Sequence, residues 1–98
     1  MVRIKWLRLA KDDLKDIYNY INIDSKRYAN LQIERIQRRT QVLKKQKLLG
    51  KIVEELGNSR IRELQEGNYR ILYRIVSEKE VHILMIHHSA RDLRRHLK

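Results

Sequence analysis

The sequence predicts an α+β fold: an N-terminal strand, an antiparallel two-helix hairpin, a three-stranded antiparallel meander, and a short C-terminal helix. Three observations lead to this fold class. Apolar residues alternate with polar ones in residues 2–6, recur at spacings of three and four in residues 10–47, and occupy the faces of strand-length segments between polar turns in residues 60–88. We therefore expect the helices to pack on one face of the sheet, leaving the other face free.

The meander is clearest in its middle strand, residues 69–76. A pleat of period two places its side chains on two faces: Tyr69, Ile71, Tyr73 and Ile75 on one, and Arg70, Leu72, Arg74 and Val76 on the other. Residues 65–68, which include the Gly67-Asn68 pair, and residues 77–80 are polar connections of hairpin length. Residues 81–88 are apolar on both faces apart from His82, which predicts a central strand.

The remaining elements follow from periodicity and capping. Val2, Ile4 and Trp6 predict a short half-buried strand. Apolar positions from 10 to 21 predict a first helix, and Ser25 is a suitable N-cap for a second helix that ends near Lys47. We expect residues 48–59 to cover the helices through Ile52, Val53 and Leu56, and Arg91 to Lys98 to form the last helix.

Composition restricts the class of protein. A chain of 98 residues predicts a single domain, residues 1–98, and the absence of cysteine excludes disulfides and thiolate zinc sites. No secretory signal or membrane-length apolar run is present, so we expect a soluble cytoplasmic protein. The net charge of +11 predicts a polyanionic partner, either nucleic acid or an acidic protein. Residues 35–47 carry six basic side chains and no acidic one.

Candidate chemistry gathers where the last strand ends. His87, His88 and Arg91 follow a nearly continuous apolar run, which brings polar groups to a sheet edge where a ligand can meet them. Because neighbours on a strand point to opposite faces, only one of the two histidines can share the face of Arg70. Two adjacent histidines without further ligands do not make a zinc site, so we expect neither metal nor other cofactor.

Short motifs along most of the chain resemble the RelE/ParE toxins of bacterial type II toxin–antitoxin systems. The motifs that carry the resemblance are Trp6 with Ala10, Asp13-Leu14, Ile17 and Tyr20-Ile21; Gly50 with Val53-Glu54-Glu55-Leu56; Ile61-Arg62-Glu63-Leu64; Asn68-Tyr69-Arg70-Ile71 with Tyr73-Arg74; and Ile83-Leu84 with His87-His88-Ser89-Ala90-Arg91-Asp92-Leu93. The resemblance implies a toxin of a plasmid-stabilisation system that arrests growth when free of an acidic antitoxin. Its target is either ribosome-bound mRNA, cut without a metal as by RelE-like members, or DNA gyrase, poisoned as by ParE-like members.

The resemblance also implies roles for individual residues. Arg70 takes the position of a phosphate-binding arginine, Arg91 matches a basic residue after the last strand, and Arg60 and Arg62 fall where nucleases of the family have a lysine pair. Arginine stays protonated at physiological pH and is a poor general base, so the candidates for proton transfer are Glu63, His87 and His88. The catalytic tyrosine of RelE-like members has no counterpart in residues 91–98, and the long first hairpin favours ParE.

Together these inferences define a candidate site and its alternatives. The catalytic candidates are Arg70, Arg91, His88, His87 and Glu63, and the nucleic-acid-binding candidates are Arg60, Arg62, Arg70, Arg74 and Arg91. We expect Arg62, Arg70 and Arg91 to converge on one solvent-facing hollow. Alternatively, Glu63 is an ion-pair partner of an arginine, Arg74 is an ordinary exposed residue, and the histidines close the end of the sheet. A non-enzymatic RNA- or DNA-binding module is the alternative function.

Overall fold

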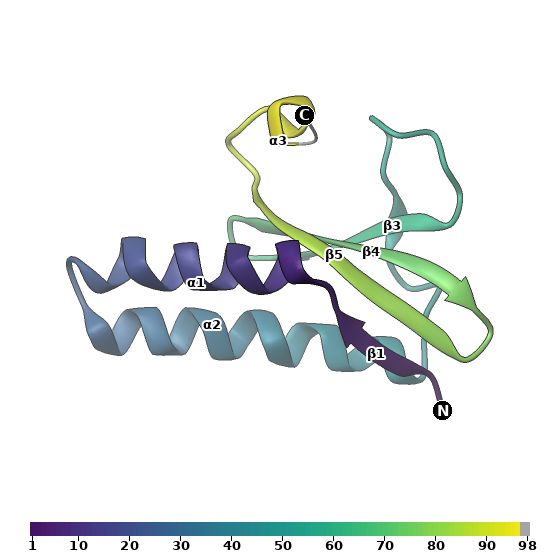
Figure 1. The fold of residues 1–98 in the computed structure, drawn as a ribbon, viewed down its shortest axis with the longest axis horizontal. Coiled ribbons are helices and arrows are strands. Elements are labelled where there is room, and N and C mark those ends of the chain that lie inside the picture. Colours follow the sequence, from purple (N-terminus) through teal and green to yellow (C-terminus); the bar gives the residue numbers. More distant parts are fainter. Residues whose placement is uncertain (97–98) are drawn as a thin grey trace.

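The computed structural model of the protein describes residues 1–96 and confirms the α+β fold class (Figure 1). In chain order the elements are β1 (Arg3–Trp6), α1 (Arg8–Asn22), α2 (Lys26–Thr40), the 3₁₀ turn η1 (Gln41–Lys44), β2 (Lys51–Ile52), β3 (Ile61–Glu66), β4 (Tyr69–Ser77), β5 (Glu80–His88) and α3 (Leu93–His96). No helix among these residues is long and apolar enough to cross a bilayer.

Within the described residues the sheet has five strands in the order β1-β5-β4-β3-β2. The antiparallel meander β3-β4-β5 is the one that the sequence predicts, and β5 lies between two neighbours, as its apolar composition indicates. β1 lies parallel to β5, with Ile4 opposite Val81. The two-residue strand β2, which the sequence analysis did not predict, pairs with β3 and forms the far edge.

The helical hairpin covers one face of the sheet (Figure 1). Ser25 caps α2 as predicted, because its Oγ accepts a hydrogen bond from the backbone N–H of Tyr28 at 3.1 Å. The main core lies between the hairpin and the sheet, and its fully buried residues include Ala10, Ile36, Leu43, Ile71, Tyr73 and Ile83.

The second helix is shorter than predicted. It ends at Thr40, and the chain then tightens into η1 instead of continuing to Lys47. This 3₁₀ turn leaves Leu43 fully buried in the main core, while the Lys44 carbonyl accepts the backbone N–H of Val2 at 3.1 Å. Ala29, Ile36, Thr40 and Leu43 of the inner stripe are therefore fully buried, but the last turn of the stripe is not α-helical.

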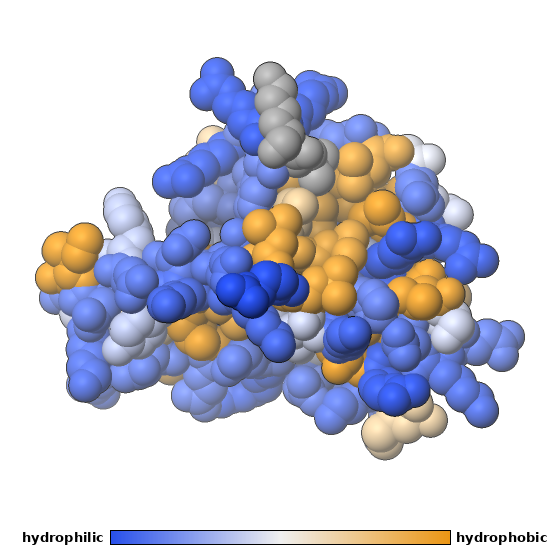
Figure 2. Space-filling model, viewed as in Figure 1, coloured by the Kyte–Doolittle hydropathy of each residue, from blue (hydrophilic) through white to orange (hydrophobic). Residues whose placement is uncertain are grey.

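The prediction that the opposite face of the sheet is free was wrong. Val53 and Leu56 pack on that face against Leu72, Met85 and Leu93, in a second, smaller core. The segment before β3 therefore covers the sheet and not the helices, because apolar residues of β4 and β5 on this face need cover. Figure 2 shows apolar side chains gathered here, between α3 and the segment that connects β2 to β3.

The C-terminal helix is also shorter than predicted. α3 begins at Leu93 and not at Arg91, and Leu93 is its buried residue. Residues 97–98, which the prediction included, lie outside the described residues.

Candidate functional site

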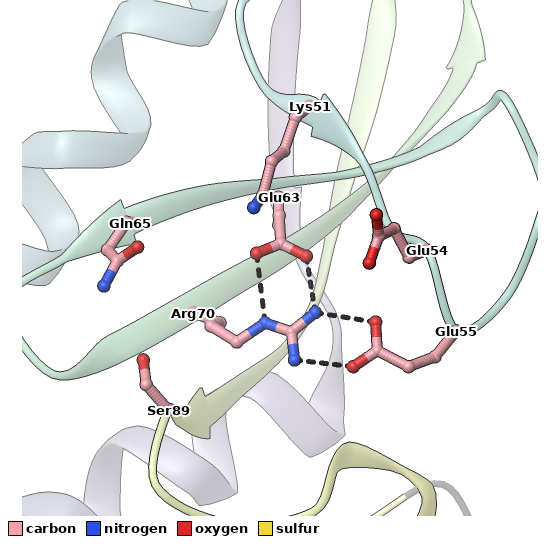
Figure 3. Close-up of a pocket in the computed structure, with 7 residues that line it drawn as sticks. All are labelled: Lys51, Glu54, Glu55, Glu63, Gln65, Arg70 and Ser89. Atoms are coloured by element: carbon pink, nitrogen blue, oxygen red, sulfur yellow. Dashed lines mark hydrogen bonds and ion pairs between the residues drawn. The ribbon is translucent and has the colours of Figure 1, made fainter.

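Arg70 is the centre of an open pocket of about 240 Å³ on the face opposite the helical hairpin (Figure 3). Its guanidinium donates to both oxygens of Glu63, from Nε to Oε1 at 3.0 Å and from Nη2 to Oε2 at 2.5 Å. It also donates two hydrogen bonds to Glu55 in a bidentate ion pair, from Nη1 to Oε2 at 2.8 Å and from Nη2 to Oε1 at 3.0 Å. The other lining residues are Lys51, Glu54, Gln65 and Ser89.

Arg70, Glu55 and Glu63 form an ion-pair cluster, called here the clamp. Its three residues come from different parts of the chain. Glu63 is on β3, on the same face as Arg70 of the neighbouring strand β4, and its side chain is only 5% exposed. Glu55 belongs to the segment between β2 and β3, and its side chain is 23% exposed. The clamp therefore ties this segment to the sheet beside the second core, in which Val53 and Leu56 are buried or half-buried.

The positive charge of Arg70 is fully neutralised by the two carboxylates of the clamp. Hydrogen bonds from Arg70 lower the pKa of Glu55 to about 2, and the two carboxylates raise the pKa of Arg70 above its already high value. The pocket lining holds two cations, Lys51 and Arg70, and three carboxylates, Glu54, Glu55 and Glu63. The chain has a net charge of +11, but this pocket has an excess of negative charge. That negative charge surrounds Arg70, the residue for which the family resemblance implies phosphate binding.

Arg62 does not join Arg70, so the predicted convergence was wrong. It lies opposite Tyr73, on the face that carries the helices, and its Nη1 donates to the Gly50 carbonyl at 2.9 Å. Gly50 is itself fixed by Tyr73, whose hydroxyl accepts the Gly50 N–H at 2.9 Å and donates to the Lys47 carbonyl at 2.7 Å. Arg62 therefore stabilises the entry to β2 from the helix side of the sheet.

The other two candidate nucleic-acid ligands on the meander are also distant from the clamp along the strands. Arg60 precedes β3 at the end opposite Glu66, and its Nη1 reaches the carbonyl of Val76 at 3.4 Å. Arg74 pairs in register with Ile61 and His82, and its side chain is exposed. The simple interpretation of Arg74 as an exposed strand residue agrees with this position.

His87 shares the face of Arg70 but is engaged elsewhere. A bulge at Leu84 shifts the pairing of β4 with β5, so that Leu72 lies opposite Met85 and Tyr73 lies opposite Ile83. Beyond the bulge, Arg70 lies opposite His87. The His87 ring is 2% exposed, with Nδ1 2.7 Å from Nδ1 of His96 and Nε2 2.9 Å from the carbonyl of Arg91. Both ring nitrogens are occupied, so His87 closes the end of the sheet and has no free nitrogen for a substrate proton.

His88 and Arg91 lie in a second, larger cleft of about 1060 Å³ between α1, the end of β5 and α3. The His88 ring stacks edge-on against Tyr69 with centroids 5.3 Å apart, and its Nδ1 accepts the Ala90 N–H at 3.2 Å. His88 is therefore on the helix side of the sheet, while the Arg70 pocket is on the other. The predicted catalytic residues are divided between two sites.

Sequence reasoning missed three residues of these sites. Glu55 appeared only as part of a family motif, and nothing in its local pattern pairs it with Arg70. His96 on α3 contacts His87, and Asp13 on α1 contacts His96, although these elements are distant in sequence. The ion-pair interpretation of Glu63, by contrast, agrees with its contacts with Arg70.

Comparison with known proteins adds a family to this geometry. The family model described as the ParE toxin of the type II toxin–antitoxin system parDE matches residues 4–93. A comparison with curated proteins gave no significant match.

Solved structures with the same fold include two that are 24% identical. One is the chromosomal ParDE toxin–antitoxin system from P. aeruginosa, with a TM-score of 0.72 over 90% of this chain and 96% of that one. The other is the toxin–antitoxin complex RelBE2 from Mycobacterium tuberculosis, with a TM-score of 0.64 over 89% of this chain and 96% of that one. The YoeB-YefM complex from Staphylococcus aureus is 14% identical, with a TM-score of 0.54 over 90% and 97% of the two chains. At these identities the likeness shows a common fold.

Proposed function

The chain belongs to the ParE toxin family of type II toxin–antitoxin systems, and on that premise we propose that it arrests growth by poisoning DNA gyrase and not by cutting mRNA. The family match identifies the class as a toxin, in agreement with the resemblance found in the sequence, and does not support the alternative of a basic module without toxin function. The target is inferred from the geometry of the two sites.

The observation that carries the proposal is that Glu55 and Glu63 already occupy the guanidinium of Arg70. RNA cleavage through the 2′-hydroxyl needs a cation for the developing phosphate charge, together with a base and an acid within reach of one another. Arg70 makes four hydrogen bonds to Glu55 and Glu63, so of the five N–H donors of a guanidinium only one is left outside the clamp. The Glu63 carboxylate is held in the same clamp, which leaves it poorly suited to act as a general base.

A protein partner explains the charge of the molecule without a nuclease site. We infer that this partner is a cognate antitoxin with an acidic segment that folds on binding, because a net charge of +11 favours association with a polyanion. Two of the similar structures are the ParDE toxin–antitoxin system and the toxin–antitoxin complex RelBE2, which is consistent with this inference.

A second target is favoured by one observation. The larger cleft brings His88, Arg91 and Tyr69 together, and these side chains include a cation and an imidazole, which can donate or accept a proton. A RelE-like ribonuclease reaction in this chain would therefore use the larger cleft and not the Arg70 pocket. In that case replacement of His88 by Gln would abolish transcript cleavage, whereas gyrase poisoning does not require His88 as an acid or base.

The experiment that separates the targets uses the purified toxin in two assays. We expect supercoiling by gyrase to be inhibited and cleaved DNA–gyrase complexes to accumulate, while ribosome-bound transcripts remain intact by primer extension. Cuts within those transcripts, together with undisturbed supercoiling at a large excess of toxin, would overturn the proposal.

A matched pair of variants tests the role of Arg70 directly. Glu55→Gln removes one of the two negative charges that neutralise Arg70, and Glu54→Gln makes the same change in net charge at the neighbouring residue, which forms no hydrogen bond or ion pair with Arg70. If Arg70 has no phosphate to bind, the two variants have equal affinities for a short single-stranded RNA. A selective increase in affinity for Glu55→Gln would support the nuclease alternative.

A further inference from the structure

A continuous line of polar contacts joins α1, β5 and α3 along the wall of the larger cleft. The Asp13 carboxylate on α1 accepts the backbone N–H of Ile86 through Oδ2 at 2.9 Å, and its Oδ1 lies 3.5 Å from Nε2 of His96 on α3. His96 Nδ1 is 2.7 Å from Nδ1 of His87, whose Nε2 is 2.9 Å from the Arg91 carbonyl. The line thus runs from one helix, through two imidazoles, to the chain segment that precedes α3.

The geometry restricts how many protons this line holds. A carbonyl oxygen only accepts hydrogen bonds, so His87 Nε2 carries a proton and donates to Arg91. Two ring nitrogens at 2.7 Å share one proton, because two N–H groups would point at each other and two lone pairs would repel. One histidine therefore donates from Nδ1 and the other accepts there. His96 Nε2 faces Asp13, and a proton on it gives the two rings together one positive charge beside the carboxylate.

A second positive charge does not fit. If both rings are fully protonated, each Nδ1 carries a hydrogen, and the 2.7 Å contact between them is lost. The charged groups around the rings do not compensate. In the cleft, Asp13 and Asp16 on α1 and Asp92 before α3 are opposed by Arg91 and Arg95, with His88 as a further titratable group. On β4, Arg70 lies opposite His87 and is already paired with Glu55 and Glu63. Tyr20 and Tyr69 are the remaining titratable side chains of this lining, and burial raises the pKa of Tyr69 above its ordinary value.

α3 depends on this line for its attachment. It has one turn, Leu93–His96, and its buried contact is Leu93, which is 1% exposed and packs in the second core with Leu72 and Met85. A helix of this length is not stable alone. Loss of the His87–His96 contact therefore removes a large part of what holds the C-terminal segment over the sheet face.

We propose that His87 and His96 form a proton-operated latch, which holds α3 against the sheet while the two rings share one proton between their Nδ1 atoms and releases it when both rings are fully protonated. Release uncovers Leu72 and Met85 and widens the larger cleft beside Arg91. This inference concerns the conformation of the toxin and is independent of whether gyrase or mRNA is its target.

Hydrogen exchange of the backbone amides tests the latch, with rates corrected for intrinsic exchange. Since opening takes up one proton, the opening constant of residues 93–96 rises by up to about tenfold for each pH unit of acidification through the range where the second ring is protonated. His96→Gln removes this pH dependence. His82→Gln, which alters a histidine paired with Glu80 outside the line, retains it. Unchanged protection of wild-type α3 between pH 7.5 and 5 would overturn the proposal, as would the same pH dependence in His96→Gln.

A second measurement does not depend on how the variants fold. Long-range ¹H–¹⁵N correlation spectra of the wild-type protein at pH 7.5 report which nitrogen of each imidazole carries a proton. The latch predicts a proton on His87 Nε2 and a single proton between the two Nδ1 atoms. A His87 ring that is protonated only at Nδ1 would contradict it.

Discussion

Replacement of Arg70 by Met separates the structural role of this residue from a catalytic one. Methionine keeps much of the length of the side chain but leaves the Glu63 carboxylate, which is only 5% exposed, without the guanidinium that binds both of its oxygens. Breaking a buried ion pair from one side costs about 3–5 kcal/mol. Because small domains have only about 5–15 kcal/mol of stability, Arg70→Met is expected to come close to unfolding the protein.

Glu55→Gln is the comparison that gives this magnitude its meaning. Glu55 is 23% exposed, and its loss leaves Arg70 still paired with Glu63, so we expect a cost of about 1–2 kcal/mol. The double variant Arg70→Met with Glu63→Gln removes the buried charge and is expected to recover about 2 kcal/mol relative to Arg70→Met alone. Urea denaturation at pH 7, followed by circular dichroism, measures all three free energies of unfolding.

A cost for Arg70→Met below about 1 kcal/mol, or no recovery in the double variant, would refute this reasoning. If the prediction holds, loss of toxicity on removal of Arg70 is not evidence of catalysis, because the protein loses its fold as well. Toxicity assays on Arg70 variants then need a parallel measurement of the folded fraction.

Three further predictions concern the surroundings of the site. The pKa of Glu55 is lowered from the ordinary 4.5 to about 2. The ionised Glu55 therefore stabilises the folded protein above pH 4.5, and this contribution is lost as pH falls towards 2. The difference in free energy of unfolding between wild type and Glu55→Gln should shrink between pH 6 and pH 3. Gly50→Ala places a Cβ 2.6 Å from the Glu63 carbonyl oxygen and from the Tyr73 hydroxyl, and should lower the free energy of unfolding in urea by more than about 2 kcal/mol. Gly57 has a φ of +58° but open space around it, so Gly57→Ala should cost about 1 kcal/mol. Equal costs would argue against the close packing at Gly50. Tyr73→Phe leaves the Gly50 N–H and the Lys47 carbonyl without their partner and should lower the thermal midpoint, with a loss of about 1–3 kcal/mol; an unchanged midpoint would contradict it.

Much of the fold is predictable because local pattern and tertiary structure agree. The alternation along β4 places Tyr69, Ile71, Tyr73 and Ile75 in or against the main core, and the Ser25 cap is where a polar residue precedes an apolar helical stripe. The cover of the second face was mispredicted because Val53 and Leu56 lie in a segment without periodicity. Only the contact with Leu72 and Met85 shows which face they cover.

The error in placing Arg62 was avoidable. The two-residue turn Gly67-Asn68 fixes the register of the β3–β4 hairpin with Glu66 opposite Tyr69, and counting back from there puts Arg62 opposite Tyr73 on the core face. The bulge at Leu84 had no comparable signal, because β5 is apolar on both sides of it and contains no glycine. Glu55 was not predicted as the partner of Arg70, since an ion pair across 15 residues leaves no local pattern.

The central claim, that this toxin acts without a phosphate-binding Arg70, is tested most directly by assaying Glu55→Gln and Glu54→Gln with gyrase and with ribosome-bound mRNA in parallel. We predict that both variants poison gyrase as the wild type does and that neither cuts mRNA. Transcript cleavage by the wild type that becomes faster in Glu55→Gln alone would contradict the account.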